Sequence, residues 1–190
     1  MPQVEDIHDL VELERLYCKC QQCPLGGTRI NFVFGSGHVS PVILFLGEAP
    51  GADEDTQGLP FVGKAGQLLT KMIQVMGIDR PDVYIANVVK CRPPGNRVPA
   101  SDEIAQCFPI IRRQIELLNP KVIVTLGNVP THALIPDAPG ITLARGSVLR
   151  YQNWNVIPTF HPSYLLRTPS AMELVWDDLK KVIELAFGTS

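Results

Sequence analysis

The chain of 190 residues lacks any run of about 18 or more apolar residues, so no helix is expected to cross a membrane. Its N-terminus carries acids and no apolar signal core, and a cytoplasmic protein is therefore expected. Basic residues are not in surplus, and the net charge of -2 argues against strong, indiscriminate nucleic-acid binding while leaving room for a local basic groove. Repeats, low-complexity segments and long linkers are also missing, so residues 1–190 are expected to form one domain.

Cysteine is present in an odd number, five, so a scheme of pairs leaves at least one unused. In a reducing compartment these residues are poor candidates for structural disulfides. Cys20 and Cys23 form a C-x2-C pair, and Cys91 and Cys107 have 15 residues between them. Four thiolates can hold Zn²⁺ or a [4Fe-4S] cluster, and the spacing does not decide between them. Cys18 is an alternative to Cys20, which would give a C-x4-C pair.

Apolar segments alternate with segments of helical spacing along the chain. Strands are predicted over 42–46, 83–89, 121–126 and 155–160. Helices are predicted over 4–17 (within an N-terminal segment 1–17), 66–76, 101–118, 128–134 and 173–187. In the helix over 101–118, Ser101 is expected as the N-cap, and a kink or a fresh start is expected at Pro109. This alternation predicts an α/β fold, a single-domain three-layer sandwich with a central four-stranded, mainly parallel sheet flanked by helices.

Each predicted strand is followed by polar side chains. Glu48 follows the first strand, Asn87 lies near the end of the second, Asn128 follows the third and His161 follows the fourth. Because the carboxyl ends of parallel strands share one edge of a sheet, where ligands bind, these groups are expected to converge there.

The segment 47–66 carries four carboxylates within eight residues. Its part 58–64 matches the G-x4-G-K start of a phosphate-binding loop, but Ala65 stands where a Mg²⁺-binding hydroxyl is needed. A solvated acidic turn is the plain alternative. Phe61, in a loop stiffened by proline and glycine, instead favours support of a planar, hydrogen-bonding ligand such as a base.

The segment 161–167 reads His-Pro-Ser-Tyr-Leu-Leu-Arg. A lone histidine is more often a satisfied core residue than a catalyst, but His161 ends a strand and precedes a proline. Leu165 and Leu166 are expected at a loop tip, where apolar side chains can wedge into a base stack.

Together these segments resemble the uracil-DNA glycosylases of family 4, the iron-sulfur type. The resemblance runs from about residue 20 to about residue 180, and residues 47–69 are its most specific block. It implies a hydrolase that releases uracil from single- or double-stranded DNA at the start of base excision repair. It also implies a [4Fe-4S] cluster rather than Zn²⁺, and a metal-ligand set of Cys20, Cys23, Cys91 and Cys107. A monomer is expected.

The resemblance also assigns roles around the reacting bond. His161 would stabilise the leaving uracil, and Glu48 or Glu54 would stabilise the sugar cation or position water. Ala49 stands where better-known relatives carry an Asp or Asn that positions this water, so its backbone or one of the two carboxylates must act instead. Glu54 is also a candidate for excluding the methyl group of thymine.

The remaining assignments concern binding. Phe61 would stack on uracil and Asn87 would bond its Watson–Crick edge, and the implied substrate-binding set is Gly47, Phe61, Asn87 and Ser163. The implied DNA-binding set is Leu165, Leu166 and Arg167, in which a leucine fills the space left by the flipped nucleotide and the arginine holds phosphate.

Two alternatives remain open at this point. The first is an iron-sulfur protein that binds uracil in DNA with little turnover or traps its product covalently. Trapping relatives carry a basic insert before the histidine motif, and here Asn155 leads straight to His161. The second is a zinc DNA-binding protein, which predicts no absorbance near ~400 nm.

Overall fold

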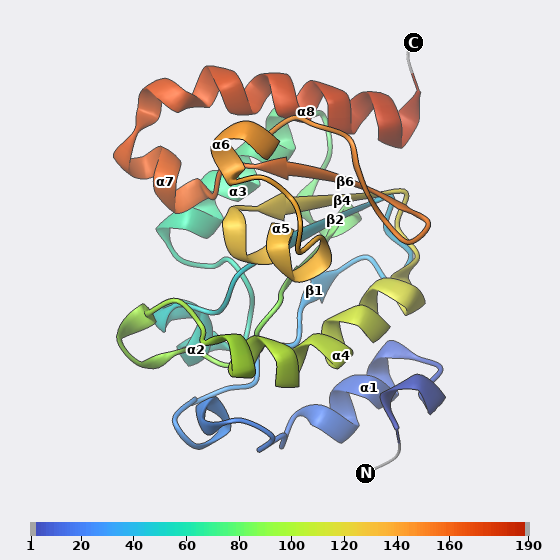
Figure 1. Cartoon of the computed structure of the whole chain (residues 1–190), viewed down its shortest axis with the longest axis vertical. Helices are drawn as coiled ribbons and strands as arrows, with labels where there is room; N and C mark the ends of the chain where they lie inside the picture. The colour runs from blue at the N-terminus through green and yellow to red at the C-terminus, as the bar shows by residue number, and fades with distance from the viewer. Residues whose placement is uncertain (1–2, 189–190) are drawn as a thin grey trace.

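The computed structural model describes residues 3–188, which form a six-stranded sheet with helices on both faces (Figure 1). Its strands are β1 (Ser36–Gly37), β2 (Ile43–Gly47), β3 (Tyr84–Asn87), β4 (Val122–Leu126), β5 (Leu149–Tyr151) and β6 (Trp154–Thr159). Its α-helices are α1 (Leu10–Tyr17), α2 (Ala52–Gln57), α3 (Lys64–Val75), α4 (Ser101–Leu118), α5 (Asn128–Leu134), α6 (Ile141–Ala144), α7 (Pro162–Arg167) and α8 (Met172–Phe187). Short 3-10 turns are η1 (Val4–Asp6), η2 (Pro24–Gly27), η3 (Arg80–Asp82), η4 (Pro94–Asn96) and η5 (Pro169–Ala171).

The strand order across the sheet is β1-β3-β2-β4-β6-β5. The inner four strands are parallel, and β1 and β5 pair antiparallel at the two edges. The predicted α/β sandwich with a mainly parallel sheet is confirmed, whereas the predicted number of four strands is wrong. The two missed strands have two and three residues, too few to show an apolar pattern. Pro158 lies in β6 beyond the residues that pair with β5, where its missing N–H disrupts no ladder on that side.

The core lies in two layers, one on each face of the sheet. In β2, Leu44 and Leu46 point into the layer under α1 and α4, and Ile43 and Phe45 point into the layer under α3 and α8. Figure 1 shows α8 and α4 on opposite sides of the strands. A strand covered on both faces needs apolar residues at every position, which explains the unbroken run in the sequence. Among residues 3–188, no helix is long and apolar enough to span a bilayer.

The single helix predicted over 4–17 is wrong. η1 ends at Asp6 and α1 begins at Leu10, because the Asp9 side chain accepts a hydrogen bond from the Glu12 N–H and caps a new helix start. Val11, an apolar residue within the predicted helix, is 76% exposed. Residues 1 and 2 of the predicted N-terminal segment lie outside the described residues.

Two other predicted features differ in detail. α4 runs through Pro109 without a break, so the predicted fresh start there does not occur. The N-cap of α4 is Ala100 rather than Ser101, and the Glu103 side chain accepts from the Ala100 N–H at 2.7 Å.

Candidate active site

A cavity of about 790 Å³ opens at the carboxyl ends of the four parallel strands. Each of these strands contributes a polar side chain to its wall: Glu48 after β2, Asn87 in β3, Asn128 after β4 and His161 after β6. Ala49, Glu54, Phe61, Ser163 and Arg167 also line it. The structure therefore brings together most of the candidate residues, while Gly47, Leu165 and Leu166 lie outside the lining.

Gly47 packs directly against the side chains of Asn87 and Phe61, two residues of the cavity lining. A Cβ at this position would come within 2.3 Å of Asn87 Oδ1 and 2.6 Å of the Phe61 ring. Gly66 has a similar effect, since a Cβ there would lie 1.8 Å from the Phe61 carbonyl oxygen. Glycine at both positions lets the Phe61 ring reach the cavity, where its centroid is 5.7 Å from that of the His161 ring.

Asn87 presents a buried amide to the cavity. Asn87 is 1% exposed, and within residues 3–188 the Oδ1 of its side chain has no hydrogen-bond partner. A buried acceptor without a partner costs about 1–3 kcal/mol, which a donor on a bound ligand would recover.

The two candidate carboxylates differ sharply in their surroundings. Glu54 accepts three backbone N–H bonds, from Gly51, Val62 and Gly63. Glu48 has no side-chain hydrogen bond within residues 3–188, and burial raises the pKa of its carboxyl. Glu48 is thus free to act on a ligand or water, whereas Glu54 holds the loop that surrounds it.

His161 lies at the start of α7, where its hydrogen bonds determine the tautomer of the neutral ring. Its Nδ1 accepts the Ser163 N–H at 3.1 Å and lies 2.8 Å from the Ser163 Oγ. Because Nδ1 is an acceptor, the proton of the neutral ring is on Nε2. Burial and the nearby Arg167 lower the pKa of His161 to about 4, so the ring is neutral at physiological pH.

The segment after His161 corrects one prediction. It forms the helix α7 rather than a loop, since Pro162 suits the first helical position. Leu165 turns inward and is 1% exposed, which removes it as a DNA wedge, and Leu166 is 48% exposed.

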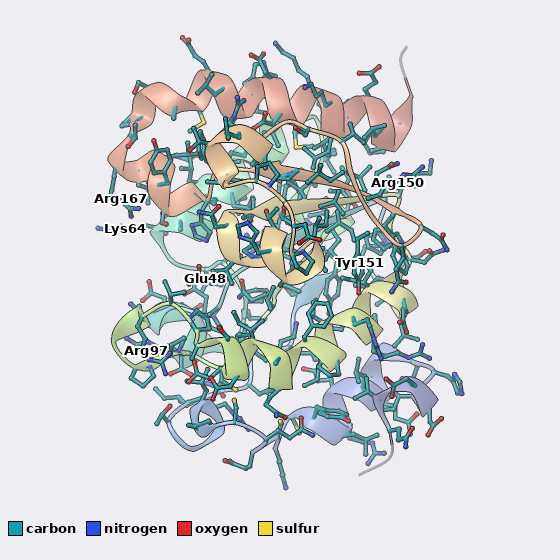
Figure 2. All side chains as sticks on the ribbon, viewed as in Figure 1. Glu48, Lys64, Arg97, Arg150, Tyr151 and Arg167 are labelled. Atoms are coloured by element: carbon teal, nitrogen blue, oxygen red, sulfur yellow. The ribbon has the colours of Figure 1, made fainter. Side chains whose placement is uncertain are left out.

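Cations flank the cavity. Arg97 and Arg167 line the cavity together with Glu48, and in the view of Figure 2 Glu48 is drawn between them in height. Arg97 is bound by Glu103 through two hydrogen bonds of 2.6 and 2.8 Å, so much of its charge is already compensated.

A second, smaller cavity is lined by Cys20, Cys23, Cys91 and Cys107, from both halves of the predicted metal-ligand set. No group of three His, Cys, Asp or Glu side chains in residues 3–188 meets the geometry for a single metal ion. Cys18 does not line this cavity, and its thiol donates to the Arg15 carbonyl instead.

Hydrogen-bond donors lie against two of these sulfurs, one from a side chain and one from the backbone. The Arg29 guanidinium donates to Cys91 Sγ at 3.2 Å and to two carbonyls of the 18–20 segment, and the Lys90 N–H donates to Cys107 Sγ. Burial raises the pKa of the Cys91 and Cys107 thiols, while Arg29 and Lys90 oppose those shifts. The donor set and its charges fit a group bound by thiolates. Arg29 carries no sequence motif, and its role was not predicted.

An aromatic platform, a buried amide, a neutral imidazole and a free carboxylate around one cavity define the site of an enzyme acting on a planar, hydrogen-bonding base. The uracil DNA glycosylase superfamily model matches residues 34–180. A type-4 uracil-DNA glycosylase of Thermotoga maritima is 47% identical over 167 residues, 86% of this chain and 87% of that protein. Similar enzymes of Sulfurisphaera tokodaii (43% over 186 residues; 93% and 84%) and Archaeoglobus fulgidus (41% over 190 residues; 96% and 94%) also match. The chain belongs to the uracil-DNA glycosylase superfamily, among its type-4 members.

Proposed function

We propose that this chain is a uracil-DNA glycosylase, which takes deoxyuridine out of the DNA stack and hydrolyses its N-glycosidic bond. The observation that carries the proposal is the buried, unpartnered Asn87 Oδ1 in a cavity that also holds the Phe61 ring and the neutral His161. Reaction at a base in DNA requires the nucleotide to be flipped out, at a cost of a few kcal/mol.

Uracil binding uses two groups of complementary chemistry. The Phe61 ring stacks on the base, and base–aromatic stacking is worth about 1–3 kcal/mol. The Asn87 Oδ1 accepts from the N3–H of uracil and its NH2 donates to O4, a pairing that cytosine would not satisfy because its N3 is an acceptor.

His161 stabilises the leaving group. When the C1′–N1 bond breaks, its electron pair goes to the base and negative charge spreads onto the uracil oxygens. A neutral imidazole with its proton on Nε2 donates a hydrogen bond to O2 of this anion without first losing a proton. Removing one such donor costs about 3–4 kcal/mol in other enzymes.

Glu48 acts on the other half of the transition state. Its carboxylate stabilises the positive charge that develops on the sugar and orients the water whose oxygen forms the new bond to C1′, accepting the water's proton as it does so. The three backbone bonds to Glu54 leave that residue a structural role in the loop. Ala49 lines the same wall without a polar side chain, which supports Glu48 as the group that holds the water.

Leu166 and Arg167 of α7 contact the DNA in this proposal. Leu166 enters the space left by the flipped nucleotide, and Arg167 binds a neighbouring phosphate. We expect a cytoplasmic monomer that accepts uracil in single- or double-stranded DNA.

The four cysteines of the second cavity hold a [4Fe-4S] cluster in this proposal. Thiolates are the ligands of such clusters, the Arg29 guanidinium supplies positive charge beside Cys91, and the Lys90 backbone N–H donates to Cys107 Sγ. The cluster ties the 18–24 segment to the 91–107 segment, and no step of glycosidic hydrolysis is assigned to it.

Incubation with a labelled single strand that contains one uracil, followed by alkali, tests the proposal. Strand cleavage at that site, absent with thymine in its place, is expected for the enzyme. A stable protein–DNA adduct without cleavage would favour covalent trapping, and binding without either result would leave a non-catalytic uracil binder. Absorbance near ~400 nm in the purified protein tests the cluster independently, since a zinc protein would be colourless.

A further inference from the structure

Phe61 stands in a backbone conformation that a bulky side chain disfavours. Its φ is +52°, in the left-handed region, where such residues persist when their surroundings hold them in place. The residue is only 6% exposed, and it lines the cavity. The geometry of this stacking platform is therefore set by contacts outside Phe61 itself.

One set of contacts fixes the backbone after Phe61. The N–H groups of Val62 and Gly63 both donate to Glu54 Oε1 at 2.9 Å. The second oxygen of Glu54 accepts the Gly51 N–H at the start of α2, so the carboxylate ties the loop to that helix.

The backbone before Phe61 is fixed by an arginine. Arg80, in η3, donates from Nη2 to the Pro60 carbonyl at 2.7 Å and from Nη1 to Thr70 Oγ1 at 2.9 Å. Thr70 lies inside α3, which starts directly after the Phe61 loop, so Arg80 joins the residue before Phe61 to that helix. Burial lowers the pKa of the Arg80 guanidinium, and the negative charge of Glu54 opposes this shift across the loop.

Arg80 is not among the residues that line the cavity, and no local motif marks it. We propose that Arg80 is a positioning residue for uracil recognition, which acts through Phe61 by holding the Pro60 carbonyl while Glu54 holds the two amides that follow. This inference rests on the proposed function, because uracil is the ligand that the Phe61 ring would meet. Hydrogen bonds from a charged donor are shorter and stronger than neutral ones, which suits a strained segment.

The test compares uracil binding in a double-mutant cycle of Arg80→Met and Phe61→Ala, with free uracil titrated by NMR into the cluster-containing protein. Arg80→Met is expected to weaken uracil binding by about tenfold, because a misplaced ring loses part of its stacking energy. In the Phe61→Ala background the same substitution should change binding less than about twofold, since residues that act as a unit are not additive. Arg150→Met, at the far edge strand, is the control and should leave binding unchanged (Figure 2).

Two further variants separate positioning from general stability. Arg80→Lys keeps a donor for the Pro60 carbonyl and should recover most of the affinity. Thr70→Val removes the hydroxyl that holds Arg80 and should weaken binding a few-fold even if Arg80→Met folds poorly. In Arg80→Met, hydrogen exchange should speed up at the Val62 and Gly63 amides and not in β4.

Equal losses in both Phe61 backgrounds, or no loss at all, would overturn the role of Arg80 while leaving the glycosylase intact. A wild-type protein that releases no uracil from DNA would instead refute the proposed function, and the inference with it.

Discussion

His161 is predicted to stay neutral far below the pH at which an ordinary histidine gains its proton. Its folded-state pKa is about 4, against an ordinary value of 6.5, a difference of 6.5 − 4 = 2.5 pH units. The unfolded chain therefore binds more protons than the folded chain between these values. The stability that depends on this ring is complete above pH 6.5 and is lost as the pH falls toward 4.

The size of the effect follows from this difference. At about 1.36 kcal/mol per unit, full protonation would remove about 3 kcal/mol of stability, and about 2 kcal/mol is already lost at pH 5. His161→Gln should remove this part of the pH dependence. His132→Gln, which replaces a half-buried imidazole bonded to the Ala138 carbonyl, is the matched control and should retain it.

The assay is an NMR titration of the ring nitrogens, combined with urea unfolding at pH 8 and pH 5. Nitrogen shifts should show the proton on Nε2 at neutral pH and a midpoint near 4. The rate of uracil release should likewise show no inflection near 6.5 from this residue. A midpoint at or above 6, or a ring protonated on both nitrogens at pH 7, would refute the neutral-donor mechanism.

Three more outcomes are expected. Glu48→Gln should lower kcat by about 10²- to 10⁴-fold with little change in uracil binding, and an unchanged kcat would remove Glu48 from the mechanism. Leu166→Ala should reduce activity on duplex DNA more than on single strands, because this side chain is exposed. Leu165→Ala should lower the free energy of unfolding by about 2–5 kcal/mol, because its side chain is buried. A stability loss confined to Leu166→Ala and an activity loss confined to Leu165→Ala would contradict these roles. Cys107→Ala should abolish absorbance near ~400 nm and destabilise the protein, and Cys18→Ala should do neither, which optical spectra and thermal unfolding will show.

The sequence predicts the parallel core of this fold because burial on both faces requires continuous apolar runs. The run 42–46 and the polar groups that follow each strand were sufficient to locate the cavity edge. The sequence did not predict which of Leu165 and Leu166 is buried. Both are leucines after His-Pro, and which one faces the core depends on a helix start at Pro162 that the loop prediction overlooked.

The role of Glu54 shows a second limit. Its carboxylate looks equivalent to Glu48 in the sequence, since both lie in one acidic segment. Their difference arises from backbone N–H groups eight and nine residues further on, which point at Glu54 through the left-handed turn at Phe61. Side chain to backbone bonds across a loop leave no periodic signal, so they become visible in the folded chain alone.

The edges of the sheet have a consequence for the behaviour of the protein in solution. An exposed strand edge offers unpaired N–H and C=O groups that a strand of another molecule can extend, a route to aggregation. Here the four long parallel strands lie inside, and an incoming strand would meet two residues of β1 at one edge and three of β5 at the other. Such short edge strands offer few backbone hydrogen bonds to a strand of another molecule, so intermolecular extension of the sheet is disfavoured. Lengthening either edge strand by design would therefore be expected to raise aggregation before it altered the cavity.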